Sequence, residues 1–354
     1  MTFPTGRVVR VRPEAVVVST LSGLRELPMG SSTETAALGD LVTWANGHVH
    51  VVARNRSARD LEAQDWWRLH RIWPNLVRRC ELMSELRAWF RDRGFVELET
   101  PVMARSPGLE VHLRAIEARS TRESRWLITS PEYYLKRVLS AGAERVFYLG
   151  RAFRDDEDGH LHHGEFTMLE WYRAGEPPRA IQDDVEAIVA LATGQPRAWT
   201  RFTVAEALER FGRPSQDPDD VITQLVERIE PALAPLGATW LERWPIALAS
   251  LARPCDDDPT VAERFEAYVD GVELCNGFGE LTDPVEQRAR CERDAAERAR
   301  LGLPAYPIDA SFLDALEAGL PPCSGVALGV DRLIMLATGA RHLDDVVAIP
   351  PRLG

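Results

Sequence analysis

The stretch that decides the fold is residues 151–173, RAFRDDEDGHLHHGEFTMLEWYR. Apolar residues on both sides of a polar centre predict two strands joined by a loop, which is a hairpin. Arg154, at the end of the first predicted strand, can hold a phosphate through two parallel hydrogen bonds. His162 can reach a further phosphate, and Phe166 offers a flat face on which a base can stack. The stretch therefore predicts a nucleotide-binding hairpin.

Two other interpretations fit the same loop. The first is an acidic surface loop with scattered histidines. The second is a metal site built from the histidines and carboxylates. The spacing of His160, His162 and His163 matches no standard zinc pattern, which counts against the metal site.

A second hairpin is predicted in residues 263–280, ERFEAYVDGVELCNGFGE. Glu266 and Glu273 come close together in such a hairpin and could share a divalent ion. Mg²⁺ prefers oxygen ligands and usually binds through one or two carboxylates plus substrate phosphates. Asn276 and Glu280 remain to bind a cationic or amine-bearing substrate. The plain alternative is a set of acids on the solvated side of an antiparallel sheet.

Two shorter stretches add weaker signals. Residues 325–332, GVALGVDR, carry two glycines that let a ligand or a backbone come close, and Arg332 then opens a helix. The same glycine spacing also fits simple helix packing. Residues 129–137, TSPEYYLKR, predict a helix start with Ser130 as the N-cap.

Toward the N-terminus, residues 1–56 alternate β-rich runs with turn signals. This pattern predicts five strands and a small barrel of the OB type. The predicted strands are Arg7–Arg12, Ala15–Thr20, Leu24–Leu27, Leu41–Trp44 and His48–Ala53. Residues 57–74 are rich in Arg and Trp and predict a linker or docking helix, in which tryptophans attach the small domain to the large one.

Residues 75–354 are expected to form one large domain. A helix begins at Asn75 with one apolar face, made of Leu76, Cys80, Met83, Leu86 and Phe90, and ends at Gly94. Strands are expected at 95–100, 126–129, 145–149, 165–173 and 268–281, mostly helix at 180–245, and a charged helix with a solvated face at 284–300. Because strands and helices mix without βαβ alternation, the fold class is α+β with an antiparallel sheet.

The composition of the 354 residues is that of an ordinary globular protein, with 45% hydrophobic and 27% charged residues and a net charge of −12. Such an acidic balance is unusual for a dedicated nucleic-acid binder. No apolar run predicts a membrane span or a secretory signal. Five cysteines without C-x-x-C spacing indicate small core residues in a reducing cytoplasm. Lys136 is the only lysine, which we attribute to coding bias because Arg replaces Lys along the whole chain.

Together these stretches resemble the three motifs of class II aminoacyl-tRNA synthetases, in the lysyl branch. Residues 75–101 resemble motif 1, the dimer element, the hairpin around Arg154 resembles motif 2, and residues 325–332 resemble motif 3. Residues 165–173, 276–283 and 323–332 are most similar to stand-alone paralogues of lysyl-tRNA synthetase that modify elongation factor P. The resemblance runs from about residue 70 to residue 349. It implies a class II synthetase-like antiparallel sheet flanked by helices, to which the N-terminal barrel is an addition.

The resemblance also implies roles for single residues. Arg154 would grip the α-phosphate of ATP, Arg332 would contact its γ-phosphate side, and Phe166 would stack on adenine. Glu266 and Glu273 would hold Mg²⁺. Further nucleotide contacts are implied for Asp155, Asp156, His162, His163, Glu273, Leu274 and Gly329. The amino-acid pocket would comprise Ser130, Pro131, Glu132, Tyr172, Asn276, Glu280 and Ala327.

The chain departs from the family at a few of these positions. The family reads Arg-Asn-Glu where this chain has Arg154-Asp155-Asp156, and His-Asn-Pro where it has His162-His163-Gly164. Ala327 stands where lysyl-tRNA synthetases tend to have glycine. Its methyl group reshapes the pocket and favours a non-standard amino acid.

The resemblance implies a homodimeric, ATP-dependent ligase. It would activate (R)-β-lysine or lysine as an adenylate and transfer it to a lysine of elongation factor P. The alternatives are a lysyl-tRNA synthetase and a non-catalytic paralogue. Six Arg against four acids give residues 1–56 a net charge of only +2, which counts against tRNA binding. The presence of Arg154, Arg332, Glu266 and Glu273 counts against a non-catalytic protein.

Overall fold

The structure is a computed structural model that describes residues 4–28, 35–46, 48–57, 59–60, 63–119, 123–155 and 159–351. It divides into two compact units, Met1–Cys80 and Glu81–Gly354, and helix α1 (Asp65–Arg91) contributes to both. The division of the chain into 1–56, 57–74 and 75–354 stays a prediction.

The first unit contains the five predicted strands in one antiparallel sheet of order β3-β2-β1-β4-β5. Strand β3 also lies against β5, which curls the sheet toward a barrel. The buried centre consists of β-branched side chains on alternate positions, among them Val8, Val16, Val18 and Val42. The strands are β1 (Thr5–Val11), β2 (Ala15–Thr20), β3 (Gly23–Pro28), β4 (Leu41–Ala45) and β5 (His48–Ala53).

Helix α1 begins earlier than the sequence predicted, at Asp65 rather than Asn75, and Pro74 lies inside it. The start is held within the first unit, because the Arg7 guanidinium lies 5.7 Å from the Trp66 ring centre. In addition, His70 Nδ1 lies 2.8 Å from Ser19 Oγ. The prediction of Cys80 as a core residue was wrong, because this side chain is exposed, whereas the other four cysteines are buried.

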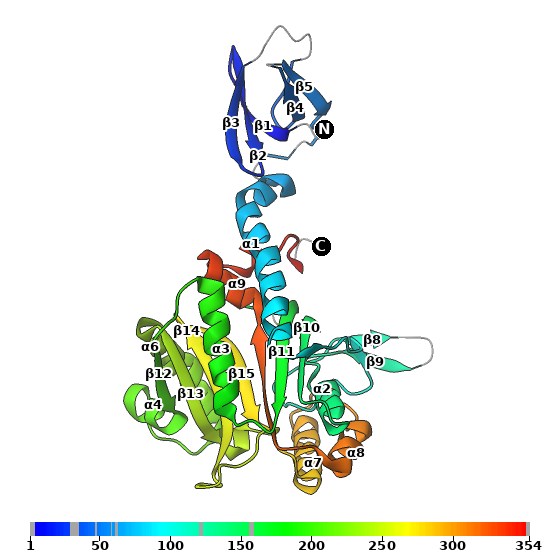
Figure 1. The fold of residues 1–354 in the computed structure, drawn as a ribbon, viewed down its shortest axis with the longest axis vertical. Coiled ribbons are helices and arrows are strands. Elements are labelled where there is room, and N and C mark those ends of the chain that lie inside the picture. Colours follow the sequence, from blue (N-terminus) through cyan, green and yellow to red (C-terminus); the bar gives the residue numbers. More distant parts are fainter. Residues whose placement is uncertain are drawn as a thin grey trace. The chain divides into compact units, whose positions relative to one another are not determined.

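The second unit is built on an eight-stranded sheet of order β12-β13-β14-β15-β16-β11-β10-β6 (Figure 1). The five central pairings are antiparallel, as predicted, and the two outermost are parallel. Its strands are β6 (Val96–Glu97), β10 (Arg145–Phe153), β11 (Glu165–Ala174), β12 (Trp199–Thr203), β13 (Ala238–Pro245), β14 (Val261–Val269), β15 (Val272–Gly279) and β16 (Cys323–Gly329). A small separate sheet contains β7 (Met103–Ala104), β8 (Glu117–Arg119) and β9 (Ser124–Leu127).

Both predicted hairpins are present. Strands β10 and β11 pair in register from Arg145–Arg173 to Phe153–Glu165. Strands β14 and β15 are joined by Asp270-Gly271, and both residues have positive φ, at 52° and 82°. Asp-Gly is the preferred sequence for such a two-residue turn, because glycine adopts positive φ without strain.

Helices cover the sheet. Helix α3 (Pro178–Thr193) packs on β15, β16 and α9 (Val330–Thr338), and α2 (Glu132–Ser140) packs on α8 (Ala310–Gly319), which contacts α7 (Pro284–Arg300) (Figure 1). Local signals fix the starts of α7 and α8, since Asp283 and Asp309 accept N-terminal backbone N–H groups. Shorter helical elements are α4 (Val204–Phe211), α5 (Pro218–Gln224), η2 (Leu225–Ile229), α6 (Glu230–Leu233), η3 (Ala234–Leu236), η4 (Ile246–Leu248) and η5 (Leu343–Asp345).

Residues 180–245 are mostly helical, as predicted, but they also include strands β12 and β13, which the sequence did not reveal. One other prediction about this unit was wrong. Helix α7 does not present only a solvated face, because Arg290 and Arg298 are buried. Their guanidinium groups donate to backbone carbonyls of neighbouring loops, a use of arginine that charge periodicity does not reveal.

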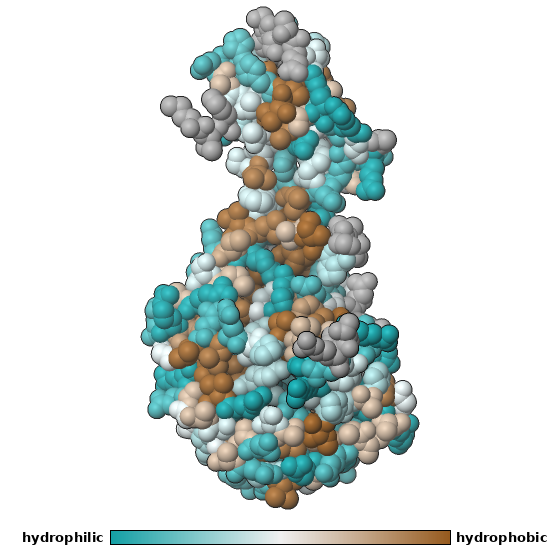
Figure 2. Space-filling model, turned by 90° about the vertical axis from the view of Figure 1, so that its right-hand side faces the viewer, coloured by the Kyte–Doolittle hydropathy of each residue, from teal (hydrophilic) through white to brown (hydrophobic). Residues whose placement is uncertain are grey.

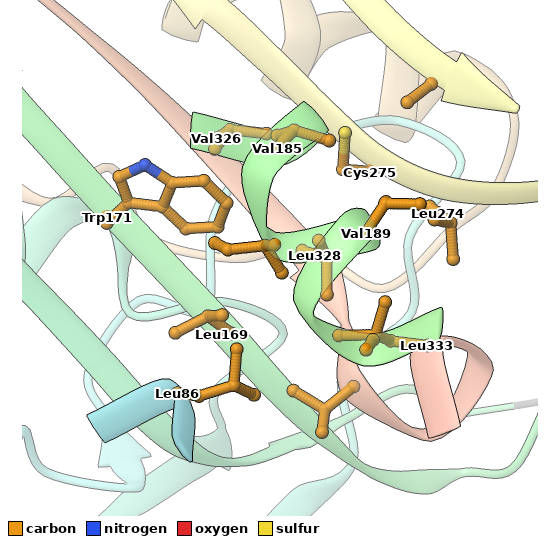
Figure 3. Packing of buried hydrophobic residues seen from close by; sticks show 14 of the residues in the cluster. Leu86, Leu169, Trp171, Val185, Val189, Leu274, Cys275, Val326, Leu328 and Leu333 are labelled. Atoms are coloured by element: carbon orange, nitrogen blue, oxygen red, sulfur yellow. The ribbon is translucent and has the colours of Figure 1, made fainter. Parts of the chain in front are cut away.

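The core lies on one face of the large sheet, where Leu169, Trp171, Val326, Leu328 and Cys275 point toward α3 (Figure 3). Residues on alternate strand positions therefore point away from this core. On the face drawn in Figure 2, apolar side chains lie in separate patches among hydrophilic ones. Within the described ranges, no helix has the length and apolarity needed to cross a membrane.

Candidate active site

A row of paired residues runs across the centre of the large sheet, on the face opposite the core. Glu266 of β14 pairs with Asn276 of β15, which pairs with Ala327 of β16, which pairs with Glu170 of β11. Residues directly opposite each other in neighbouring strands share one face. Residues from three sequence motifs that are far apart in the chain thus come together on four adjacent strands.

The next row of residues on the same face shows why residue 325 is a glycine. Gly325 of β16 pairs with Tyr172 of β11. A Cβ atom added at Gly325 would lie 2.2 Å from the Tyr172 ring and 2.9 Å from Glu280 Oε1. Glycine is therefore needed at this position, because the tyrosine ring and the carboxylate occupy the space of a side chain.

A buried lysine joins two of the predicted substrate-binding carboxylates. Lys136 Nζ lies 2.5 Å from Glu132 Oε1 and 2.6 Å from Glu280 Oε2. Lys136 is 1% exposed and Glu280 is 0% exposed. Burial raises the pKa of Glu280 to about 8, although the charge of Lys136 acts to lower it. Burial opposes the charge of Lys136, but Glu132 and Glu280 together raise its pKa, so the ammonium is retained.

Glu170 is a third buried carboxylate beside them. It accepts hydrogen bonds from Ser130 Oγ at 2.6 Å and from the Tyr172 hydroxyl at 2.9 Å. Burial, together with the nearby charge of Glu132, raises the pKa of Glu170 to about 8. Glu132, Glu170 and Glu280 therefore form one acidic cluster, called the acidic pocket below, in which Ser130 joins the start of α2 to Glu170 of β11.

Three buried oxygen atoms of the pocket have no hydrogen bond among the described residues. They are Asn276 Oδ1 and both carboxylate oxygens of Glu280, of which Oε2 lies in the ion pair with Lys136. A buried acceptor without a partner costs about 1–3 kcal/mol, so such atoms call for an explanation. A ligand that carries N–H donors would satisfy Asn276 Oδ1 and Glu280 Oε1.

A loop contributes further residues next to Ser130 and Glu132. Ser106, Gly108 and Glu110 line one hollow together with Ser130 and Glu132. Burial and the nearby Glu132 raise the pKa of Glu110. The loop is anchored by Arg298 of α7, whose Nη1 donates to the carbonyls of Glu110 at 2.8 Å and Leu113 at 3.0 Å.

The predicted nucleotide residues gather at the opposite end of β11 and β16. The Arg154 guanidinium lies 5.2 Å from the Phe166 ring centre. Arg332 Nη1 donates to the Glu273 carbonyl at 2.8 Å and lies 3.2 Å from Glu273 Oε2. Arg332 Nη2 lies 2.6 Å from His162 Nε2. Because arginine only donates, His162 Nε2 must accept.

The remaining predicted nucleotide residues are placed as follows. His163 Nε2 lies 3.0 Å from Asp344 Oδ1, and both side chains are buried. Asp155 is exposed, and its N–H donates to the Arg114 carbonyl. The Leu274 side chain belongs to the core, so only its backbone can face a nucleotide. Gly329 directly precedes α9. Asp156 lies outside the described residues.

Glu266 and Glu273 have the chemistry of an Mg²⁺ site, although within the described ranges no cluster of three or more His, Cys, Asp or Glu surrounds a common metal position. Burial raises the pKa of Glu266 to about 7, and the repelling charge of Glu273 adds to this. Two carboxylates that repel each other gain from a shared cation. Glu266 Oε2 now accepts from the Tyr268 hydroxyl, and Oε1 lies 2.5 Å from Arg264 Nη2.

Sequence reasoning missed three residues of the acidic pocket and misplaced one. Glu170 stands two positions before Tyr172 on one strand and thus on the same face, a signal that was available. Lys136 and Glu110 had no such signal, because a helix and a loop bring them in. Ser130 is not the N-cap of α2, since the helix begins at Glu132 with the buried Pro131 before it. The Ser130 hydroxyl accepts the Glu132 N–H and donates to Glu170.

Comparison with known proteins agrees with this arrangement. A family model described as tRNA synthetases class II (D, K and N) matches residues 62–352. The elongation factor P–(R)-β-lysine ligase of Proteus mirabilis (strain HI4320) is 40% identical over 320 residues, covering 82% of this chain and 98% of the relative. The ligase of the same name from Salmonella gallinarum is 41% identical over 313 residues, covering 80% of this chain and 96% of the relative. The chain therefore belongs to the class II (D, K and N) tRNA synthetase family, in the branch of the elongation factor P–(R)-β-lysine ligases.

Proposed function

We propose that this protein is an ATP-dependent ligase that joins (R)-β-lysine or lysine to the ε-amino group of a lysine on translation elongation factor P, in the cytoplasm. The observation that carries the proposal is the acidic pocket formed by Glu132, Glu170 and Glu280, in which Glu280 Oε1 is buried without a partner among the described residues. A buried carboxylate is stable only when it is paired, so this pocket suits a small molecule with two ammonium groups.

In this proposal the amino acid lies on the sheet face formed by Asn276, Ala327 and Tyr172. Glu280 and Glu132 would each take one ammonium group, and Asn276 Oδ1 would accept a further N–H. Ser130 and Pro131 would border the pocket at the start of α2. The substrate carboxylate would then point along β11 toward Phe166 and the nucleotide.

ATP would lie at the other end of the same face. Phe166 would stack on adenine, and Arg154 would bind the α-phosphate through its two N–H groups. Arg332, with His162 beside it, would contact the γ-phosphate side. Asp155, Asp156, His163, Glu273, the Leu274 backbone and Gly329 would complete the nucleotide contacts.

Glu266 and Glu273 would hold Mg²⁺ together with phosphate oxygens of ATP. When bound, the ion would neutralise part of the phosphate charge. For that arrangement, Arg332 must exchange its contact with Glu273 for a phosphate oxygen, and Arg264 must share Glu266 with the ion.

The reaction needs no nucleophile from this chain. A carboxylate oxygen of the amino acid attacks the α-phosphorus of ATP, the bond to the bridging oxygen breaks, and pyrophosphate leaves. The deprotonated ε-amine of the acceptor lysine then attacks the carbonyl carbon of the adenylate, AMP leaves, and the amide nitrogen loses a proton. The chain contributes positioning and charge stabilisation, chiefly through Arg154 and Arg332.

We further propose that the ligase acts as a homodimer, with the motif 1 region in the interface. Val96, Val102 and Met103 follow α1 and remain exposed although they are large and apolar. Large exposed apolar side chains within one short stretch of sequence fit an interaction site. Light scattering that gives the mass of one chain at micromolar concentration would contradict the dimer.

A mass-shift assay tests the function. The purified protein is incubated with ATP, Mg²⁺ and either lysine or (R)-β-lysine, and with either elongation factor P or bulk tRNA from the same organism. We expect the factor to gain one lysyl unit, while the tRNA stays uncharged. Charged tRNA with an unmodified factor would show a lysyl-tRNA synthetase instead. Modification of neither acceptor, with no pyrophosphate release, would refute the ligase.

A further inference from the structure

Lys136 is the only lysine of the chain, and it lies inside the acidic pocket. The proposed reaction gives it no part, because its ammonium group is paired with two carboxylates and is not a nucleophile. A fixed cation inside a pocket for a cationic substrate competes with that substrate. Its position therefore calls for a reason.

We propose that Lys136 is a positioning residue of the amino-acid pocket, which holds one oxygen of Glu132 and one of Glu280 and so leaves the second oxygen of each turned toward the substrate's ammonium groups. The inference rests on the proposed function and adds a specificity determinant to it.

The environment of Glu280 supports this role. Both of its oxygens are buried and neither has a hydrogen bond among the described residues, but Oε2 is held by the ion pair with Lys136 Nζ at 2.6 Å. Oε1 would lie 2.9 Å from a Cβ at Gly325, and the Tyr172 ring borders the same space. The open oxygen thus faces the row that also carries the pocket's tyrosine.

Glu132 is held in a matching way. Its Oε1 lies 2.5 Å from Lys136 Nζ, one helical turn away along α2, and its backbone N–H donates to Ser130 Oγ at 3.0 Å. Its side chain is 12% exposed and lines the hollow that also contains Glu110. One ammonium therefore fixes two carboxylates that come from different parts of the chain.

Lys136 also controls the charge of the pocket. Burial raises the pKa of Glu280, and among the groups that lower it Lys136 has the largest effect, followed by Arg253. Glu132, which lies on α2, raises the pKa of Glu280 instead. Other titratable groups around the site are Glu170 and Tyr172 of β11, Cys323 of β16, Cys291 of α7 and Glu110 of the loop.

Without Lys136, Glu280 would hold its proton to higher pH. A protonated carboxyl is a poor partner for an ammonium group, because it has lost its charge. An opposite charge within about 4–6 Å shifts a carboxyl pKa by about 1–3 units, so the effect of removing Lys136 is measurable. A lysine that served packing alone would leave the pH dependence of substrate binding unchanged.

The test is calorimetric titration of the full chain with lysine and with (R)-β-lysine between pH 6.5 and 9.5. The variants are Lys136→Met and Lys136→Arg, and the matched control is Arg137→Met, which removes the exposed neighbouring cation of the same helix. For Lys136→Met we expect about tenfold weaker amino-acid binding at pH 7. The midpoint, which is the pH at which the affinity is half-way between its low-pH and high-pH values, should rise by about one unit. ATP binding and the behaviour of Arg137→Met should equal those of the wild type.

Lys136→Arg decides the matter if Lys136→Met does not fold. This variant keeps the positive charge but replaces the compact ammonium group with a planar guanidinium group. The pH midpoint of amino-acid binding should therefore stay the same, while the affinity for the amino acid falls severalfold. The inference is overturned by an unmoved midpoint in Lys136→Met, or by wild-type affinity in either variant. If the wild-type protein itself binds neither isomer, it is the proposed function that fails.

Discussion

The Tyr172 ring occupies the space directly above Gly325, so that a Cβ atom on Gly325 would lie 2.2 Å from Tyr172 Cε1. The two residues are paired across the central strands β11 and β16, where neither backbone can move away without disturbing the sheet. This contact leads to the first prediction.

Gly325→Ala should destabilise the fold by about 1–3 kcal/mol, because overpacking forces a buried side chain out of its rotamer. Amino-acid binding should weaken as well, since the displaced ring carries the hydroxyl that donates to Glu170. Urea unfolding measures the first effect and calorimetric titration the second. A double-mutant cycle with Tyr172→Ala should show favourable coupling between the two substitutions, and strict additivity would contradict the contact.

Arg332→Ala should lower ATP–pyrophosphate exchange about 100- to 1,000-fold, because it removes a charged donor aimed at the phosphates. The dimer should remain, although loss of the hydrogen bonds to the Leu161 and Glu273 carbonyls should lower the unfolding midpoint somewhat. Arg341→Ala, which removes an exposed arginine just after α9, is the matched control. Unimpaired exchange in Arg332→Ala would disprove the assignment of Arg332 to ATP.

Binding of the amino acid should release protons at pH 7, and the affinity for the amino acid should be lower at lower pH. Burial raises the pKa of both Glu170 and Glu280 to about 8, so these carboxyls hold protons in the empty pocket near neutrality. An ammonium ligand favours the ionised form, and affinity therefore rises with pH until about 8 and then levels off. Calorimetry in two buffers of different ionisation enthalpy measures the released protons. A pH-independent affinity between 6 and 8 would contradict the prediction.

Arg298→Met should cost about 3 kcal/mol of stability, since it leaves buried carbonyl oxygens without a donor. Arg298 donates to Glu110, Leu113 and Pro304, so the loop beside the acidic pocket loses its anchor. The amino-acid KM should rise more than the KM for ATP. Arg300→Met is the control from the same helix, because its pair with Glu297 is exposed and contributes little. Equal effects of the two substitutions on stability would count against the anchor.

Local patterns predicted the parts of this fold that local patterns determine. The alternation of β-rich runs with turn signals revealed strands β1 to β5, and the hairpin of β14 and β15 was expected in residues 263–280. Strands β12 and β13 were missed because their apolar residues are read equally well as helical when the neighbouring strand is unknown. Helix α1 begins at Asp65 because contacts of Trp66 and His70 with the first unit hold its start, and these are tertiary contacts.

The residues of the candidate site also fall into two groups, those that sequence spacing brings together and those that only the folded chain brings together. Residues on one strand face, such as Asn276 and Glu280, could be grouped from their spacing. Lys136 could not, because its neighbour Glu280 is far away in the sequence and nothing in the helix pattern distinguishes a buried lysine from a solvated one. Leu274 was expected at the nucleotide, but the pairing of β14 with β15 shifts register at this residue, and its side chain lies in the core beside that of Cys275.

The single buried lysine also has a chemical consequence for the chain itself. An aminoacyl adenylate that escapes its site acylates accessible ε-amines, and this chain exposes none, since its one ε-amine is 1% exposed and protonated between two glutamates. The enzyme thus offers no side-chain amine of its own to the intermediate that it makes. In a mixture with its acceptor protein, only lysine side chains of the acceptor would form amides with the adenylate. Probes that label lysine ε-amines would therefore distinguish the two proteins in the same sample.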